Sequence, residues 1–142
     1  MRVLRGAVVA GLVCAFGLVA NAAEAPPDDF VKAMKDLALF ARDMREPGAE
    51  QDLAKASRYV SIIRDAFGVV GEYWTDRNGA GEFNAEIATT QEAIKAASDM
   101  GVAATLASPE GVAASVKDIL ERCQPCHAAH REKAPGGGFL IK

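Results

Sequence analysis

Apolar side chains recur every three or four residues along four stretches of this chain, which is the pattern of helices that bury one face. The first three stretches run from about residue 28 to 46, from 49 to 70 and from 82 to 100. The fourth follows Ser108 and Pro109, a favourable cap and first residue for a helix. Glycine and proline separate the stretches. We therefore predict an all-α protein, built as an antiparallel four-helix bundle with short loops.

Each predicted helix has one apolar stripe. The stripes consist of Phe30, Met34, Leu37, Ala41 and Met44 in the first helix, Leu53, Ala56, Val60, Ile63, Phe67 and Val70 in the second, Phe83, Ile87, Ile94 and Ala97 in the third, and Val112, Val116, Ile119 and Leu120 in the fourth. The next position on the fourth stripe is Cys123. Alanine is abundant and runs of β-branched residues are scarce, so we expect no strand. The glycines after Pro135 are expected to end the domain and to leave residues 135–142 as a C-terminal tail.

The first 22 residues have the layout of a secretory signal peptide. Arg2 and Arg5 form a short positive region, residues 6–20 are apolar and uncharged, and small residues follow. A membrane-spanning helix would need about 20 apolar residues, so we predict cleavage after Ala22 rather than an anchor. Residues 23–134 then form the folded domain.

Cleavage changes the charge balance. The full chain has 16 Lys and Arg against 19 Asp and Glu, and loss of Arg2 and Arg5 leaves 14 against 19, a net charge of −5. An acidic chain lacks the basic patch of nucleic-acid binders. We expect a periplasmic protein with no stable membrane association that meets basic partners transiently. A homodimer is possible, but no exposed apolar stripe indicates one, so the sequence does not decide the oligomeric state.

One motif carries chemistry, Cys123-Gln124-Pro125-Cys126-His127, near the end of the fourth helix. Residues at i, i+3 and i+4 share one face of a helix, so the two thiols can reach the two vinyl groups of one porphyrin while the imidazole binds its iron. Because Cys123 continues the buried stripe, we expect one covalent haem c inside the bundle, near the C-terminal end of the last helix.

Two other kinds of site use the same residue types. A redox dithiol normally follows a strand in a βαβ unit, whereas this motif ends a helix. A zinc site would need Cys123, Cys126, His127 and His130 to converge within eight residues. Structural zinc sites usually separate their ligand pairs by about a dozen residues or more. We expect His130 to be solvated or to lie beside a haem propionate, and Cys14 to be removed with the signal peptide.

On these residues the chain resembles the class II c-type cytochromes, which are the cytochrome c prime group and its low-spin relatives. In that family the haem motif ends the last of four helices and often continues with an aromatic residue, an arginine and a lysine. Here His130 takes the place of the aromatic residue, and Arg131 and Lys133 follow. The arginine common near the start of the first helix has only Lys32 as a counterpart. The resemblance implies an exported monohaem protein whose partners are periplasmic redox proteins.

The function then depends on the second axial position of the iron. In the family, a methionine there implies one-electron transfer, and an open position implies binding of nitric oxide or carbon monoxide. The first and last helices of such a bundle are antiparallel neighbours, which places Met34 near the level of His127. Met44 lies about 15 Å further along, and Met100 is at the opposite end. We predict an electron carrier, not an enzyme, with His127 and Met34 as iron ligands. The alternative is a five-coordinate, gas-binding haem with Met34 in the core.

Overall fold

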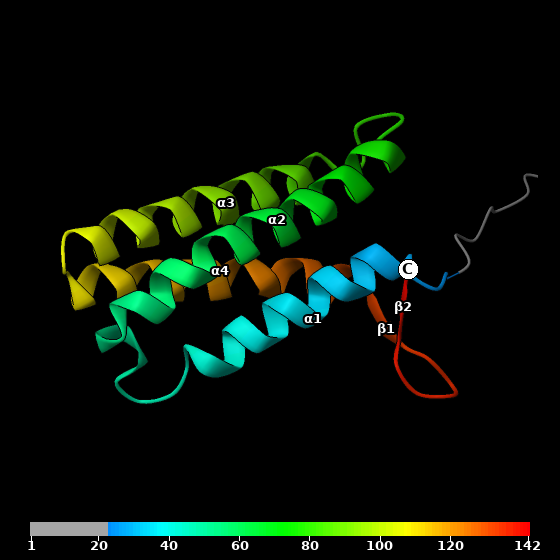
Figure 1. The fold of residues 1–142 in the computed structure, drawn as a ribbon. Coiled ribbons are helices and arrows are strands. Elements are labelled where there is room, and N and C mark those ends of the chain that lie inside the picture. Colours follow the sequence, from blue (N-terminus) through cyan, green and yellow to red (C-terminus); the bar gives the residue numbers. More distant parts are fainter. Residues whose placement is uncertain (1–22) are drawn as a thin grey trace, which may run out of the picture.

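The computed structural model describes residues 23–142, and the predicted signal peptide, residues 1–22, lies outside this part of the chain. Its four α-helices are α1 (Asp28–Asp43), α2 (Leu53–Arg77), α3 (Asn84–Thr105) and α4 (Pro109–His130). The shorter elements are a 3₁₀-helix, η1 (Ala49–Gln51), and two strands, β1 (Arg131–Lys133) and β2 (Phe139–Ile141). Successive helices run in opposite directions (Figure 1), as predicted.

Each helix packs along the next one: α1 against α2, α2 against α3, and α3 against α4. The largest fully buried side chains of this core are Trp74, Phe40, Ile63, Met100, Ile119 and Val112. The pair α1 and α4 is different, because these two helices run close together almost nowhere along their described length. The short η1 makes closer contact with α4 than α1 does. The fold is therefore mainly helical, as predicted, with one loosely packed pair of helices.

The second and third helices are longer than the apolar pattern indicates. We expected the second helix to end near Val70, but α2 continues to Arg77 and passes through Gly68. Its extra turns bury Trp74, which is only 2% exposed. Similarly, α3 continues through Gly101, where we expected it to stop. A glycine inside a helix costs about 1 kcal/mol relative to alanine, and the apolar area buried by the extra turns outweighs that cost.

The connection between α1 and α2 also differs from the prediction. The first helix ends at Asp43 rather than near Glu46, and the second begins at Leu53 rather than at residue 49. Gly48 has a φ of 81°, a left-handed conformation that favours glycine, and it reverses the chain before η1. The side chain of Asp52 then caps α2 by accepting a hydrogen bond of 2.8 Å from the Lys55 amide.

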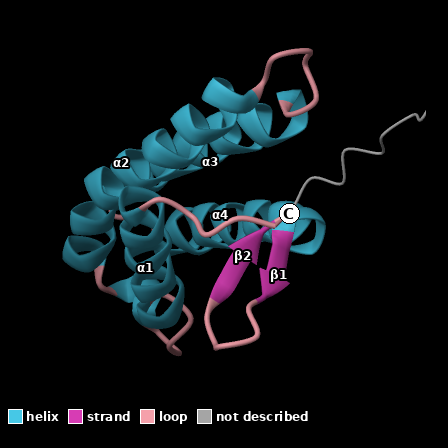
Figure 2. Ribbon diagram, turned by 90° about the vertical axis from the view of Figure 1, so that its right-hand side faces the viewer, coloured by secondary structure: helices cyan, strands magenta, loops and turns pink. Residues whose placement is uncertain are grey.

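The expectation of no strand was wrong. After α4 the chain forms an antiparallel hairpin in which Arg131 pairs with Ile141 (Figure 2). Gly137 and Gly138 have φ values of 94° and 80°, so the turn uses backbone conformations that side chains disfavour. The glycines after Pro135 therefore make a turn instead of ending the folded part, and the predicted tail folds back on the end of α4.

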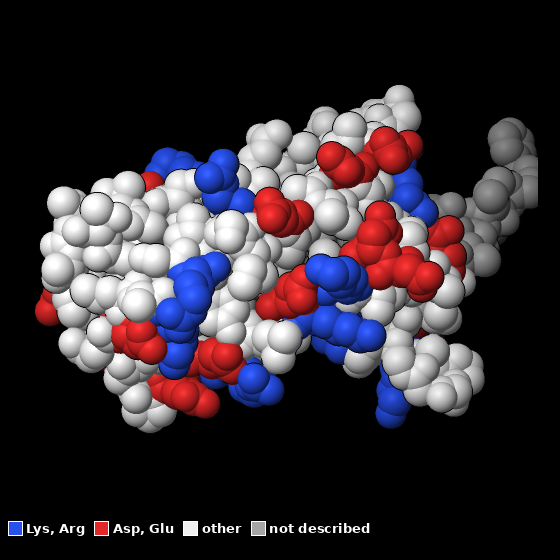
Figure 3. Space-filling model, in the orientation of Figure 1, with Lys and Arg blue, Asp and Glu red and all other residues white. Residues whose placement is uncertain are grey.

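Acidic and basic side chains are interspersed on the face drawn in Figure 3. Several exposed ion pairs join residues one helical turn apart, such as Lys32 with Asp36 at 2.8 Å and Lys95 with Asp99 at 2.7 Å. Exposed pairs of this kind contribute little to stability, because water and salt screen the charges. Within residues 23–142, no helix combines the length and the apolar character needed to cross a membrane.

Two glycines provide a test of this packing. At Gly68 an added methyl group would have nothing within 4 Å, so Gly68→Ala should raise the free energy of unfolding by about 0.5–1 kcal/mol. At Gly111 it would come 2.9 Å from the Cβ of Ala103, where α3 meets α4. Gly111→Ala should therefore lower the free energy of unfolding by about 1–3 kcal/mol. Denaturant titration of both variants measures these changes, and shifts of the same sign would contradict the packing described here.

Candidate functional site

The predicted motif occupies the last turns of α4. Cys123 and Cys126 are half-buried and pack against the hydrophobic core. The Cys123 thiol donates to the backbone oxygen of Ile119 at 3.6 Å. His127 is exposed, because it lies about 100° further round the helix than its neighbour Cys126. The two cysteines thus continue the buried stripe of α4, and the histidine lies at the border of that stripe.

Burial raises the pKa of both thiols. The pKa of Cys126 rises to about 11, first because the thiol is buried and then because the Glu86 carboxylate is near. Burial also raises the pKa of Cys123, against the opposing charge of Arg45. Both cysteines are free and, with these shifts, protonated at neutral pH. Disulfide exchange requires a thiolate, so the pair is poorly suited to dithiol redox chemistry.

The imidazole of His127 is held in its neutral form. Partial burial of the ring is the main cause of a lowered pKa, and the positive charge of Arg131 lowers it further. A histidine binds a metal ion through a neutral imidazole, so this environment favours the state that can act as a ligand.

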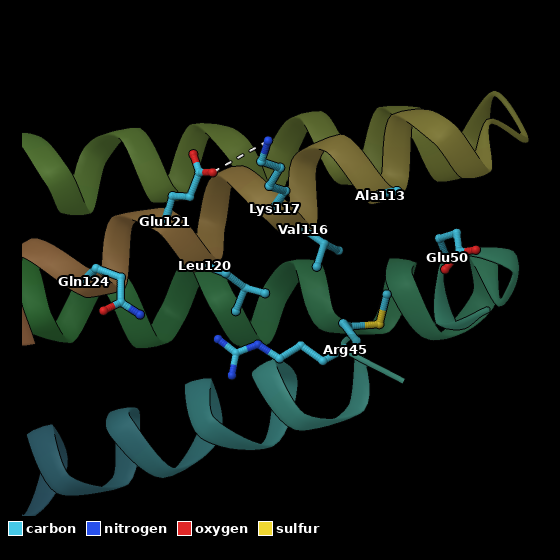
Figure 4. Close-up of a pocket in the computed structure, with 9 residues that line it drawn as sticks. Arg45, Glu50, Ala113, Val116, Lys117, Leu120, Glu121 and Gln124 are labelled. Atoms are coloured by element: carbon cyan, nitrogen blue, oxygen red, sulfur yellow. Dashed lines mark ion pairs between the residues drawn. The ribbon is translucent and has the colours of Figure 1, made fainter. Parts of the chain in front are cut away.

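A groove lies between α4 and the connection that follows α1. It has a volume of about 360 Å³ and is lined by Met44 and Arg45, just beyond the end of α1, and by Val116, Leu120 and Gln124 of α4. Figure 4 shows the side chain of Arg45 extending into the space between α1 and α4, below Leu120. Pockets of about 300–1,000 Å³ are typical of small-molecule sites.

Met34 and His127 lie near the same end of the bundle. Met34 follows the start of α1 at Asp28 by six residues, and His127 precedes the end of α4 at His130 by three. Because α1 and α4 are antiparallel (Figure 1), these two helix ends lie at the same end of the bundle. Helix geometry therefore places Met34 and His127 at similar levels, about 9 Å and about 4.5 Å from those helix ends.

Met34 lies at the flank of the buried face of α1, not at its centre. The residues buried there are Ala33 and Phe40, where the apolar pattern indicated Met34 and Ala41. Met34 is half-buried and packs against the core.

A polar cluster that the sequence analysis missed lies at the end of α4. His130 is not solvated: its side chain is 17% exposed, and its Nε2 donates to Glu86 Oε1 at 2.7 Å. Its Nδ1 lies 3.1 Å from the backbone oxygen of Lys142, and its ring packs on Trp74 with centroids 4.6 Å apart. The sequence does contain a sign that Glu86 faces the interior, since Glu86 precedes the buried Thr90 by one helical turn. The buried face of α3 consists mostly of alanines, so its apolar pattern is too weak to mark a carboxylate as unusual.

The N-terminal segment fastens the hairpin next to this cluster. Glu24 and Ile141 exchange two backbone hydrogen bonds of 2.8 Å. The Glu24 carboxylate accepts a hydrogen bond of 2.9 Å from the Tyr73 hydroxyl and pairs with Arg77. The bond to Arg77 and then the bond to Tyr73 lower the pKa of Glu24. We call these contacts of Glu24 with Ile141, Tyr73 and Arg77 the Glu24 clip. The clip joins both ends of the described chain to the C-terminal end of α2.

No protein-family model, curated protein or solved structure gives a match to this chain. Within residues 23–142, no group of three or more His, Cys, Asp or Glu side chains is arranged to hold a metal ion. The chemistry of the site is therefore inferred from its own residues.

The clip predicts a local change in stability. Glu24→Ala removes the bonds to Tyr73 and Arg77, which are worth about 1 kcal/mol at this partly exposed position. Amide hydrogen exchange at Ile141 should become about fivefold faster. Because the pKa of Glu24 is lowered on folding, its contribution is complete above its ordinary value of 4.5 and is lost as the pH falls through the lowered value.

The matched control is Glu132→Ala, which removes an exposed carboxylate from β1. It should leave exchange at Ile141 close to that of the unaltered protein. Equal exchange rates in the unaltered protein and in Glu24→Ala would show that the clip does not hold the hairpin.

Proposed function

We propose that this protein is a periplasmic monohaem c-type cytochrome that carries single electrons. Cys123 and Cys126 would hold the haem through thioether bonds, and His127 and Met34 would be its axial ligands. When bound, the haem supplies a one-electron iron couple, and a methionine–histidine ligand pair raises its potential. The chain itself would hold the group and present the two ligand atoms.

The observation that carries this proposal is the placement of the four residues. Cys123 and Cys126 pack against the core from the last turns of α4, and His127 follows them directly. Helix geometry brings Met34 of α1 to a similar level of the bundle. The loose packing of α1 against α4 leaves that pair of helices without the close side-chain contact of the other neighbouring pairs, which suits a flat macrocycle between them.

The chemistry of these residues also fits a covalent haem. Their spacing brings both thiols and the imidazole to one macrocycle, and the lowered pKa of His127 favours the neutral ligand. The raised pKa values of Cys123 and Cys126 argue against a thiolate-based dithiol centre. The exposure of His127 brings this side of the site near the surface, which suits exchange of electrons with a partner protein.

One observation favours the alternative, a five-coordinate haem that binds nitric oxide or carbon monoxide. Met34 packs against the hydrophobic core, and methionine is a common filler of core gaps. If that packing holds the thioether away from the iron, the distal side stays open to small gases.

The proposed location and partners of the protein rest on residues 1–22 and on the net charge. The signal-peptide layout of residues 1–22 supports export, and a mature net charge of −5 favours redox partners with basic surfaces. The acidic balance offers no support for nucleic-acid binding, and a homodimer remains open.

Covalent attachment has a direct consequence for the mass of the protein. Exported protein, denatured after maturation with a haem-attachment system, should weigh one haem more than the chain that begins at Ala23. The haem should stay with the polypeptide in acidic organic solvent, because thioether bonds survive it. Extraction of the colour into the solvent would contradict attachment at Cys123 and Cys126.

Substitution of Met34 separates the two haem functions. If its sulfur binds the iron, the oxidised protein is low-spin with a weak near-infrared band of sulfur ligation, and the reduced protein binds carbon monoxide poorly. Met34→Ala should then give a high-spin haem of lower potential that binds carbon monoxide readily. Absorption spectra and a redox titration measure these changes.

Met44→Ala is the matched control, since Met44 is on the same helix but about 15 Å further from the level of His127. Its spectrum should equal that of the unaltered protein. A high-spin unaltered protein whose spectrum does not change in Met34→Ala would replace the electron carrier with the gas-binding alternative.

A further inference from the structure

Two buried side-chain polar atoms have no hydrogen-bond partner within residues 23–142, and they lie in the same cluster. They are the indole nitrogen of Trp74 and Oε2 of Glu86. The other carboxylate oxygen of Glu86 is bound to His130, and the ring of His130 packs on Trp74. A buried polar atom without a partner destabilises a fold, so two at one place call for an explanation.

Glu86 exerts its charge on the haem motif. Its partner His130 follows Cys126 by four residues on α4, so these two side chains are neighbours on one face of that helix, with Cβ atoms about 5–6 Å apart. In agreement with this placement, the Glu86 carboxylate raises the pKa of the Cys126 thiol. The Glu86 side chain is only 15% exposed. Water and salt therefore screen this charge much less than they screen the exposed carboxylates of the same helix.

His130 holds Glu86 in this position and is itself held by the C-terminal residue. Nε2 of His130 donates to Glu86 at 2.7 Å, and the backbone oxygen of Lys142 lies 3.1 Å from Nδ1 of the same ring. The hairpin and the Glu24 clip hold Lys142 at this point, because Ile141 pairs with Glu24. Both ends of the described chain thus contribute to holding one carboxylate near Cys126.

We propose that Glu86 is a positioning charge that lowers the reduction potential of the haem carried at Cys126. This inference deepens the proposed function and rests on it. Reduction adds one electron from a partner protein to the haem and makes the site more negative by one charge. A fixed carboxylate nearby opposes that change and favours the oxidised form. His130 and the hairpin act through Glu86 by holding it in place.

The experiment compares the reduction potentials of mature, haem-loaded proteins in one buffer. Glu86→Gln keeps the shape of the side chain and removes its charge, so it should shift the redox equilibrium three- to tenfold toward the reduced form. At 59 mV per tenfold change for one electron, that is a rise of roughly 30–60 mV. Glu86→Asp keeps the charge and should show less than half of this rise.

Glu92→Gln is the matched control. Glu92 is on the same helix and is also ion-paired, to Arg122 at 2.6 Å, but it is exposed. The substitution changes the total charge by the same amount and should shift the equilibrium by less than twofold. If Glu86→Gln does not fold, Glu86→Ala replaces it, with the same rise expected.

The thermal stability of each variant distinguishes the proposal from a purely structural role. A structural role predicts a lower melting temperature for Glu86→Gln, Glu86→Ala and Glu86→Asp, with potentials equal to that of the unaltered protein. That result, obtained with haem attached in every variant, would overturn this inference and leave the proposed function intact. Failure of haem attachment in the unaltered protein would instead overturn the proposed function.

Discussion

An amphipathic helix in a small domain must bury its apolar face against another element. In this protein, α1 and α4 each bury that face mainly against one neighbouring helix. The face of α1 is buried against α2, and that of α4 against α3, so the first and last helices meet only loosely. The groove lined by Arg45 and Leu120 lies beside this loosely packed pair of helices. The proposed function depends on the loose packing, because the proposed haem would lie between α1 and α4. A closely packed α1–α4 pair would leave no room for a macrocycle between these helices.

The end of the bundle is held differently from its middle. Along the middle, alanines and aliphatic side chains bring α2 and α3 close together, and dispersion and burial stabilise the contact. At the end beyond the Cys123–His127 motif, a hydrogen bond between His130 and Glu86 replaces apolar packing. Taking these polar groups out of water costs free energy that the hydrogen bond offsets only in part. The hairpin and the Glu24 clip are the structural means by which this polar end stays ordered.

The main features of the fold could be predicted from the sequence, and the reasons are local. Ser108 and Pro109 mark the start of α4, and the apolar period marks all four helices. The helix ends were less predictable, since Gly71 and Gly101 stay helical where they face Thr90 and Val60 across the contact between α2 and α3, and no local pattern contains these contacts. The hairpin escaped prediction because three-residue strands carry almost no periodic signal and depend on pairing with each other.

The same distinction applies to the candidate site. The spacing of Cys123, Cys126 and His127 is visible in the sequence, and helix geometry alone brings Met34 to their level. Glu86 could not be found in this way, because its role depends on a contact with His130, 44 residues later. Long-range contacts between polar residues leave no periodic trace in a single sequence.

The most direct measurement of the central claim is the pyridine haemochrome spectrum of protein matured with a haem-attachment system. Pyridine displaces the protein ligands, so the spectrum reports only the porphyrin and its side groups. Attachment at Cys123 and Cys126 predicts the blue-shifted spectrum of a haem whose two vinyl groups are saturated by thioether bonds. The spectrum of unmodified haem, or a colourless protein with two free thiols, would contradict it.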